Sequence, residues 1–409
     1  MVKLSQRVQG ISESVTLKLN AKAQALSEEG KQVYNLTAGQ LPFRPIQDFS
    51  NLIAKELDFL KSYQYSPVPG FPELRKKLVE HIEKTRSISF EKAGIEVDAV
   101  VGNGGKHVLA NLFSALVDPD DEVVLMAPYW ISYTEMTKLA GGVAKVVEAN
   151  VFDAFVPSLE KLEQQMTSKT KIVVLNSPNN PSGIHYSKEW MESFAQLMKK
   201  YPEVSIISDE IYFHLNYFDP APSYFYQDHP ELLERTFIVD GISKSLAATG
   251  LRVGYVIGPK DVMKGVSRLQ GQTASGANSL MQRALMSFDF DKTQEYLEPI
   301  KIHLRDNSRI LREKFREGQL NSIWYQTQSA FYYLVDFSGT PVMEKFRKNA
   351  SDDKDYAADI CELLLEEYGV AIVPGSDFGA PNTARLSLVP PKEQFSEAIS
   401  RLVDFLTAK

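Results

Sequence analysis

The stretch GISKSLAATGLRVG, residues 241–254, sets one lysine among serines and small residues and follows it with an arginine. A lysine held in a partly dry pocket loses its proton more easily than a surface lysine and can form a Schiff base with an aldehyde. Arg252 is placed to bind a phosphate that Lys244 does not itself touch. The stretch therefore predicts a ligand at Lys244.

Short β-branched runs alternate with longer helical patterns around this stretch. They are EVVLMAP (122–128), KIVVLNSP (171–178), VSIISDE (204–210), TFIVDG (236–241) and VGYVIGP (253–259). The alternation predicts an α/β fold with a mostly parallel central sheet flanked by helices. Polar residues gather just after these runs, and in open sheets of this kind ligands bind at the carboxyl ends of the strands.

A long amphipathic pattern over residues 291–319 leads away from this region. Two further strand candidates, AFYYLVDF (330–337) and ARLSLV (384–389), precede a closing amphipathic helix. These elements predict a smaller α+β domain. We expect a large domain over residues 46–290 and a small domain formed by residues 1–45 and 291–409.

The composition excludes several classes of function. The chain has 409 residues, 44% hydrophobic and 24% charged, which is typical of a globular protein. A net charge of −7 and the lack of a basic run argue against nucleic acid as a partner. No apolar run is long enough for a signal peptide or a membrane span, so we expect a cytoplasmic protein. With Cys361 as the one cysteine and no paired spacing among 6 histidines, we expect no disulfide and no metal.

Three more segments carry groups suited to a phosphorylated ligand. In VVGNGGKHVLANLF (100–113), glycines at a strand-to-helix junction would let an anion reach free backbone N–H groups. Asn180 follows a strand in NSPNNPSG (176–183), where two prolines fix the loop, and Asp209 ends a strand in SDEIY (208–212). Singly, each segment also fits an ordinary turn or helix cap. Together they predict a ligand with a basic ring nitrogen, a phenolic oxygen, a phosphate and a carbonyl.

The order of these motifs resembles the fold-type I pyridoxal-phosphate aminotransferases. The segments are YSPVPGFPELR (65–75), GNGGKHVLANLF (102–113), APYWISY (127–133), NSPNNPSG, SDEIY, GISKSLAATGLRVGY (241–255) and ARLSL (384–388). The resemblance covers nearly the whole chain and is greatest to the bacterial aspartate aminotransferases, including those that also accept prephenate. It implies the cofactor pyridoxal 5′-phosphate and a ping-pong transfer of an amino group from L-aspartate to 2-oxoglutarate.

The resemblance also implies cofactor contacts. Lys244 would form the Schiff base, Asp209 would pair with the pyridine nitrogen, and Tyr212 would bond the ring hydroxyl together with Asn180. Trp130 would stack on the ring. The remaining cofactor-binding residues implied are Gly104, Gly105, Lys106, Ser243, Arg252 and, from a neighbouring subunit, Tyr65. The contribution of Tyr65 across subunits implies a homodimer.

For the substrate, the resemblance implies that Arg385 binds the α-carboxylate in a bidentate manner beside Gly39. Lys106 would read the distal carboxylate with help from hydroxyls of Ser14 and Thr16, although a solvated lysine at a helix start also fits the pattern. Trp130 and Asn180 would contact the substrate as well as the cofactor.

Two departures from the family pattern stand out. Gly241 replaces a serine that bonds the phosphate in many relatives, and AGQLPF (38–43) differs from the usual AGEPDF-like segment. Alternatives are an aromatic or other aminotransferase, a β-eliminating lyase on the same scaffold, or a non-catalytic sensor module. The helix-turn-helix domain that precedes such sensors does not fit, because the match begins within the first residues. A nicotinamide-dependent dehydrogenase lacks its G-x-G-x-x-G signal.

Overall fold

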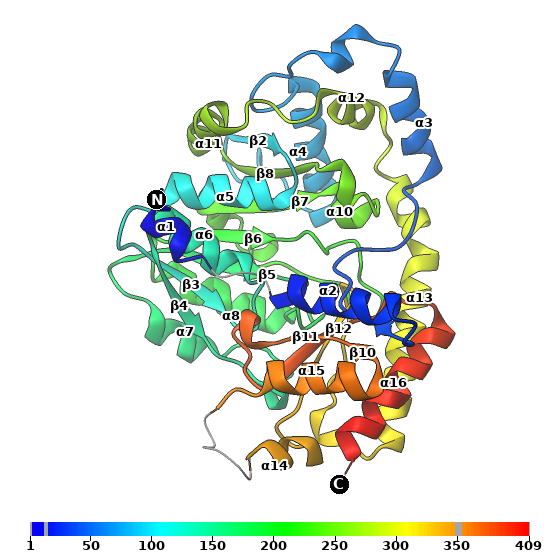
Figure 1. Cartoon of the computed structure of the whole chain (residues 1–409). Helices are drawn as coiled ribbons and strands as arrows, with labels where there is room; N and C mark the ends of the chain where they lie inside the picture. Colours follow the sequence, from blue (N-terminus) through cyan, green and yellow to red (C-terminus); the bar gives the residue numbers. More distant parts are fainter. Residues whose placement is uncertain (1, 12–14, 348–353, 409) are drawn as a thin grey trace.

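A computed structural model describes residues 2–11, 15–347 and 354–408 of the chain (Figure 1). Its centre is a seven-stranded sheet with the order β2-β8-β7-β6-β5-β3-β4. Strand β8 runs antiparallel to both neighbours, and the other strands run parallel to one another. The strands are β2 Val97–Gly102, β3 Glu122–Met126, β4 Val143–Val147, β5 Thr170–Asn176, β6 Ser205–Asp209, β7 Thr236–Gly241 and β8 Gly254–Pro259.

Helices cover both faces of this sheet because the strand residues alternate between two apolar clusters. Val123 and Leu125 of β3 pack into one cluster, and Val124 and Met126 pack into the other. The first cluster includes side chains of α5 (Gly105–Leu116), α6 (Ser132–Ala140) and α11 (Lys260–Thr273). The second includes side chains of α4 (Pro72–Arg86), α7 (Leu159–Gln165) and α8 (Lys188–Lys199). Both faces are therefore buried, as expected for a mostly parallel sheet.

Shorter helices complete this part of the chain. They are α3 Gln47–Glu56, α9 Phe225–Asp228, α10 Ile242–Ser245 and α12 Ser279–Ser287.

Helix α13 (Lys292–Glu317) runs from the large sheet to a second group of elements (Figure 1). There, β9 (Tyr332–Asp336), β11 (Val373–Pro374) and β12 (Thr383–Ser387) form an antiparallel sheet in the order β11-β12-β9. The helices of this group are α14 Pro341–Arg347, α15 Ala357–Tyr368 and α16 Lys392–Thr407.

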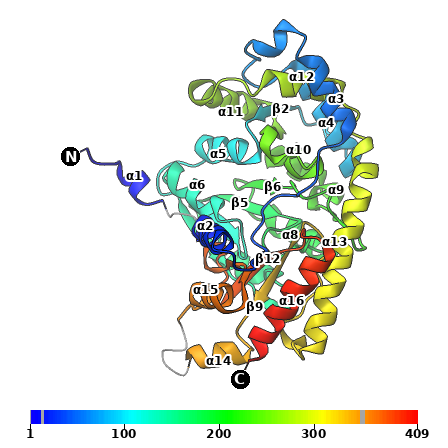
Figure 2. The same cartoon turned by 45° about the vertical axis from the view of Figure 1, so that its right-hand side comes forward.

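The N-terminal segment joins this second group. Strand β1 (Tyr34–Asn35) pairs in parallel with β10 (Val370–Ala371), and α2 (Val15–Glu28) lies beside the same region. The short helix α1 (Gln6–Gln9) projects away from the body of the molecule (Figure 2). The N-terminal and C-terminal parts of the chain thus meet in one place, while the division at residues 46 and 291 stays a prediction.

The predicted α/β architecture is confirmed, with two differences in detail. The run VGYVIGP forms β8, but this strand is antiparallel to its neighbours in an otherwise parallel sheet. Strand β4, an edge strand with the sequence VAKVV, was not predicted. Its central lysine and partial exposure give it the weaker pattern of an edge strand. Within the described ranges, no helix combines the length and the apolar character that crossing a membrane would require.

The burial along α13 leads to a test of the core. Leu311 is fully buried, whereas the adjacent Arg312 is exposed. We expect Leu311→Ala to lower the free energy of unfolding by about 2–5 kcal/mol, because the substitution leaves a cavity in a packed core. Arg312→Ala serves as the control and should change it by no more than about 0.5 kcal/mol. Denaturant titrations of both variants measure the difference, and equal effects would contradict the proposed burial.

Candidate active site

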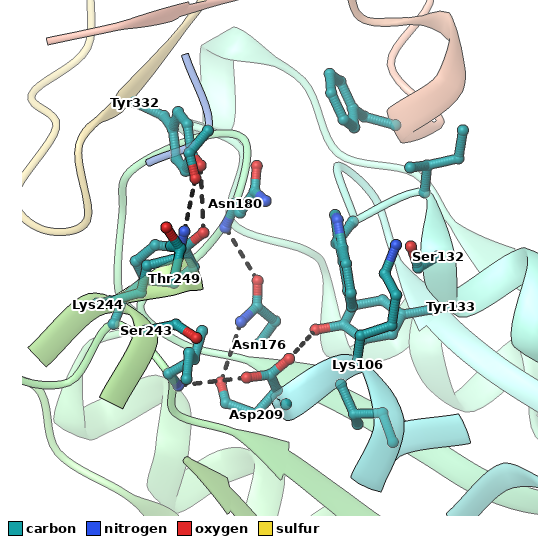
Figure 3. A pocket seen from close by; sticks show the side chains of 18 of the residues that line it. Lys106, Ser132, Tyr133, Asn176, Asn180, Asp209, Ser243, Lys244, Thr249 and Tyr332 are labelled. Carbon is teal, nitrogen blue, oxygen red and sulfur yellow. Dashed lines mark hydrogen bonds between the residues drawn. The ribbon is translucent and has the colours of Figure 1, made fainter. Parts of the chain in front are cut away.

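The carboxyl ends of β5, β6 and β7 meet at a cavity of about 640 Å³ (Figure 3). Adjacent strands are in register there, since Asn176 pairs with Asp209 and Asp209 pairs with Val239. Eleven of the predicted site residues line this cavity: Gly39, Gly105, Lys106, Trp130, Asn180, Asp209, Tyr212, Ser243, Lys244, Arg252 and Arg385. The fold therefore gathers residues that lie far apart in the sequence.

Lys244 lies on α10, directly after β7, and is partly buried. Its Nζ donates a hydrogen bond of 2.6 Å to the backbone oxygen of Gly39 and lies 5.7 Å from the ring centre of Tyr212. Burial lowers the pKa of Lys244 to about 7, and the positive charges of Arg385 and Arg252 add to this effect. Near neutral pH a large share of this amine is therefore uncharged and able to act as a nucleophile or a base.

Asp209 ends β6 and is buried, with 4% of its surface exposed. The Tyr133 hydroxyl donates to its Oδ2 at 2.6 Å, and the backbone N–H of Ile211 donates to its Oδ1 at 3.3 Å. Burial raises the pKa of Asp209 to about 6, while these two hydrogen bonds oppose the rise. A cation entering the cavity would favour the ionised form of this carboxylate.

The opposite side of the cavity is suited to an anion. Gly104 caps the start of α5 with φ of +89°, a conformation that favours glycine. A Cβ at this position would lie 2.6 Å from Nη2 of Arg252, so the glycine allows the guanidinium to approach the helix start. Arg252 itself is held through Thr249, whose backbone oxygen accepts a hydrogen bond of 3.0 Å from Nη1. Backbone N–H groups and a guanidinium together form a site for a phosphate.

Lys106 lies in the first turn of α5, with its Nζ 4.9 Å from the ring centre of Trp130. Burial lowers the pKa of Lys106, and the charge of Arg252 contributes. The residue is exposed, and its ammonium lies within cation–π distance of Trp130 at the wall of the cavity.

The structure accounts for Gly241, where many relatives have a serine. A Cβ at Gly241 would lie 2.8 Å from the backbone oxygen of Val253 and 2.9 Å from Cα of Gly254. Gly241 and Gly254 face each other in the β7–β8 ladder. The close approach of these two strands thus leaves no space for a side chain at position 241.

Arg385 of β12 is buried and contacts the cavity from the side of the second group of elements. Its Nη1 donates to Oδ1 of Asn180 at 3.0 Å, and its Nη2 donates to the backbone oxygen of Thr37 at 3.3 Å. Its guanidinium lies 4.5 Å from the ring centre of Tyr332 and 5.0 Å from that of Phe378. Among the described residues, the buried Nε of Arg385 has no hydrogen-bond partner. This arrangement leaves a donor for a carboxylate.

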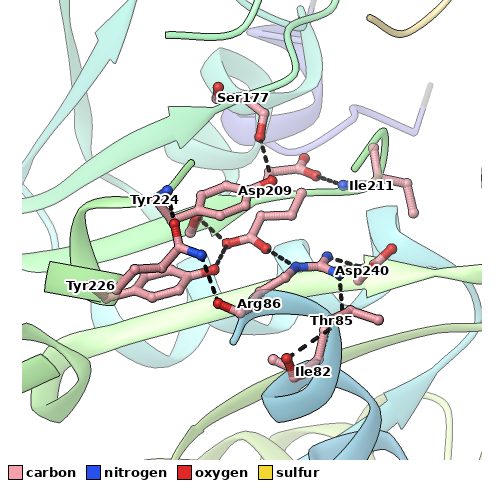
Figure 4. Close-up of polar contacts among 12 residues, drawn as sticks. Ile82, Thr85, Arg86, Ser177, Asp209, Ile211, Tyr224, Tyr226 and Asp240 are labelled. Atoms are coloured by element: carbon pink, nitrogen blue, oxygen red, sulfur yellow. Dashed lines mark hydrogen bonds and ion pairs between the residues drawn. The ribbon is translucent and has the colours of Figure 1, made fainter. Parts of the chain in front are cut away.

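A buried ion-pair cluster lies beside Asp209 (Figure 4), on the face of the sheet covered by α4, whereas Tyr133 packs on the other face. Arg86 of α4 binds Oε2 of Glu210 and Oδ2 of Asp240, each at 2.8 Å, and its guanidinium lies 3.5 Å from the ring centre of Phe213. The Tyr226 hydroxyl donates to the other oxygen of Glu210 at 2.6 Å. Burial opposes the charge of Arg86, yet the two carboxylates raise its pKa above the ordinary value, so the group is a cation. We call these residues the Arg86 cluster.

Four predicted site residues are not among the eleven that line the cavity. Gly104 lies next to the cavity as the cap of α5. Tyr65 is 94% exposed and is not among the residues that line this cavity in the described parts of the chain. Ser14 lies outside the described residues, and so does the side chain of Thr16, which belongs to α2.

Sequence reasoning missed several residues of the cavity. Tyr133 and Tyr332 both line it, yet one lies at the start of a helix and the other in a strand that resembled core. Asn176, at the end of β5, donates from Nδ2 to the backbone oxygen of Asp209 at 3.0 Å and accepts from the backbone N–H of Asn180 at 2.9 Å. Its position at the start of NSPNNPSG could have identified Asn176 as a residue of the cavity.

Comparisons with known proteins agree with this geometry. The family model described as aminotransferase class I and II matches residues 31–402. The aspartate/prephenate aminotransferase of Thermus thermophilus is 35% identical, with 98% of each chain covered, and the aspartate aminotransferase of Thermotoga maritima is 36% identical, with 99% and 100% covered. The solved structure of aspartate aminotransferase from Thermus thermophilus with maleate superimposes with a TM-score of 0.86 at 34% identity, covering 99% of this chain and 100% of that one. The chain therefore belongs to the class I and II aminotransferases, which are pyridoxal-phosphate enzymes of fold type I.

Proposed function

We propose that this aminotransferase moves the amino group of L-aspartate to 2-oxoglutarate by a ping-pong mechanism in which Lys244 is the amine that bonds the cofactor. The observation that carries the proposal is the placement of Arg385 and Lys106 in one cavity with Lys244. Two cations suit the two carboxylates of a dicarboxylic substrate. The amine of Lys244 would serve as the general base that moves the substrate proton.

The residues of the cavity fit pyridoxal phosphate. Gly104, Gly105 and Arg252 would hold the phosphate, because the glycine cap brings the guanidinium close to the first N–H groups of α5. Asp209 would meet the ring nitrogen, and Trp130 would lie against the ring. When bound, the cofactor supplies an aldehyde and an electron-withdrawing ring that stabilises negative charge at the substrate carbon.

Asn180 and Tyr212 would bond the hydroxyl of the cofactor ring. Asn180 is held through its backbone N–H by Asn176 and through its Oδ1 by Arg385, which leaves its Nδ2 to donate to a ligand. The Tyr212 hydroxyl lies 3.3 Å from the hydroxyl of Tyr332, and burial raises its pKa well above the ordinary value. Tyr212 therefore stays a neutral donor over the working pH range.

Lys244 is suited to moving a proton at the substrate. Its lowered pKa allows the side chain to accept a proton near neutral pH and to return it, which is the requirement for general acid–base catalysis. Asp209, which lines the same cavity, supplies a negative charge. Ser243, which precedes the lysine, is buried and also lines the cavity.

The choice of aspartate depends on Lys106. The Arg385 guanidinium, which lines the cavity, is suited to the α-carboxylate, and Lys106 beside Trp130 is suited to a second carboxylate. Maleate, the compound named with the Thermus thermophilus enzyme, is itself a four-carbon dicarboxylate. A site of this charge favours a short dicarboxylic amino acid over an apolar one.

The variant Lys106→Met tests whether Lys106 sets the preference for aspartate. We expect kcat/KM for L-aspartate to fall about 10- to 100-fold, which is the loss of a charge-assisted hydrogen bond, while kcat/KM for L-alanine changes less than about 3-fold. Lys161→Met, an exposed position on α7, is the matched control. Equal losses for both amino acids would contradict the role of Lys106 and leave transamination in place.

The pKa of Lys244 predicts a pH dependence of cofactor capture. Because a protonated amine cannot attack an aldehyde, the rate at which apo-protein binds pyridoxal phosphate covalently should rise with pH through about 7 and then level off. Arg385→Leu removes a positive charge that lowers this pKa, so the midpoint should move to higher pH, whereas Arg312→Leu should leave it unchanged. Stopped-flow absorbance measures both, and an unchanged midpoint in Arg385→Leu would contradict the electrostatic account.

We further propose a homodimer in which Tyr65 reaches the neighbouring site. Exposed apolar side chains gather in one segment between α3 and α4, namely Leu57, Phe59, Leu60, Tyr63 and Tyr65. An exposed cluster of this kind is typical of an interface. The segment is also held in place, since Ser66 Oγ donates to the backbone oxygen of Ala277 at 2.8 Å. Tyr65 thus points outward from an ordered segment.

Mixed dimers test this assignment. Tyr65→Phe should bind pyridoxal phosphate several-fold more weakly, and Lys244→Ala should not bond it covalently. If Tyr65 acts on the neighbouring subunit, unfolding and refolding the two variants together should produce a class of sites with unaltered affinity, detected by cofactor titration. A mixture that shows only the two parental behaviours would indicate that Tyr65 acts within its own subunit or not at all.

A further inference from the structure

The ionised state of the Asp209 carboxyl group depends on the hydrogen-bond donors around it. Its carboxylate is buried, and burial raises its pKa to about 6, so any lost donor would move this pKa into the working pH range. Tyr133 provides the shorter of its two side-chain hydrogen bonds, at 2.6 Å against 3.3 Å for the N–H of Ile211. A short O–H···O⁻ bond is the stronger kind of hydrogen bond in proteins.

Tyr133 is fixed in its position. Only 1% of its surface is exposed, and its ring packs in the apolar cluster on the α5 and α6 side of the sheet. The ring meets Trp130 edge to face, with centres 5.5 Å apart and an angle of 89° between planes. Its backbone oxygen accepts from the Thr137 hydroxyl at 2.8 Å, and its N–H donates to the backbone oxygen of Trp130 at 3.0 Å. The hydroxyl therefore cannot turn away from Asp209 without repacking.

Tyr133 is also a constant donor. Burial and the nearby Asp209 carboxylate raise the pKa of its phenol well above the ordinary value, so the proton stays on the phenol oxygen. A neutral donor stabilises the carboxylate without adding a charge that would compete with a cationic ligand.

The other charged groups around Asp209 act in opposing directions. Glu210 and Asp240 repel its negative charge, but both are paired with Arg86 on the other face of the sheet. Lys244 faces it from α10 and favours the anion when protonated. Tyr212 and Tyr186 also lie within electrostatic reach of this group of residues, and both stay neutral because burial raises the pKa of each phenol.

We propose that Tyr133 is a positioning residue for the cofactor: it holds Asp209 as a fixed anion whose free side faces the ring nitrogen. The inference rests on the proposed role of Asp209 and extends it to Tyr133, which lines the same cavity. Tyr133 also contacts both Asp209, through its hydroxyl, and Trp130, through its ring.

The test is a double-mutant cycle on cofactor affinity. Apo-protein is titrated with pyridoxal phosphate between pH 6 and 9 for the unaltered chain, Tyr133→Phe, Asp209→Asn and the double variant. We expect Tyr133→Phe to weaken binding about 10-fold at pH 8, in line with a hydrogen bond to a charged group. The loss should grow as the pH falls, because without the hydroxyl the pKa of Asp209 is higher and the carboxylate is protonated sooner. In the Asp209→Asn background the same change should alter affinity less than about 2-fold.

Tyr333→Phe is the matched control. Tyr333 is fully buried, and its hydroxyl donates to the backbone oxygen of Ile323 at 3.0 Å, but it does not line the cavity among the described residues. Tyr133→Phe loses the hydrogen bond to Asp209, and Tyr333→Phe loses that to Ile323 together with a longer one of 3.3 Å accepted from the Tyr325 N–H. The thermal stability of Tyr333→Phe should therefore fall at least as much as that of Tyr133→Phe. Only Tyr133→Phe should change the pH dependence of cofactor affinity.

The results distinguish a failure of the proposed role of Asp209 from a failure of the proposed role of Tyr133. If Asp209→Asn does not weaken cofactor binding, the proposed role of Asp209 fails and the role of Tyr133 fails with it. If Asp209→Asn weakens binding and Tyr133→Phe does not, or if the effect of Tyr133→Phe is equally large in both backgrounds, the inference on Tyr133 alone is overturned.

Discussion

The pairing of Arg86 with Glu210 and Asp240 is the interaction on which this site depends. Consecutive strand residues point to opposite faces, so an aspartate at the end of β6 that faces the cavity is followed by a glutamate that faces the core. A buried carboxylate without a partner is costly, and two of them lie on that face. The guanidinium from α4 pairs with both, which ties this helix to the strand ends. Asp209 is the carboxylate of this group that lines the cavity.

Opposing charges then organise the cavity itself. Asp209 supplies negative charge at one end, while Arg252, Lys106 and Arg385 supply positive charge around the rest of the wall. Lys244 lies among these groups, and the same positive charges that attract phosphate and carboxylates also lower the pKa of its amine. Burial is the main cause of the lowered pKa of Lys244, and Arg385 and Arg252 add to it, so these two arginines affect both the charge of the cavity and the reactivity of the amine.

The sequence predicted much of this arrangement because strand ends in an α/β sheet share one edge. Asn180, Asp209 and Lys244 follow separate strands, and that rule alone places them together. The direction of β8 could not be predicted, since VGYVIGP has the same pattern in either direction and its orientation depends on pairing with β2. The contact between Tyr133 and Asp209 was missed for a similar reason: it arises from the packing of α6 on the sheet, which no local pattern encodes.

The pairing of β1 with β10 has a consequence for biosynthesis. Gly39 lines the cavity and the Thr37 oxygen accepts from Arg385. In the same segment, the Leu36 N–H donates to the backbone oxygen of Ala371 at 2.9 Å, and the Leu36 oxygen accepts from the Ser387 N–H at 2.8 Å. Domains form as the chain emerges, so the seven strands of the large sheet are available to a ribosome-bound chain long before those partners exist. The N-terminal segment must wait until Ala371 and Ser387 have been translated. A nascent chain can therefore build the wall of the cavity at Arg252 before the wall at Gly39 and Arg385 is complete.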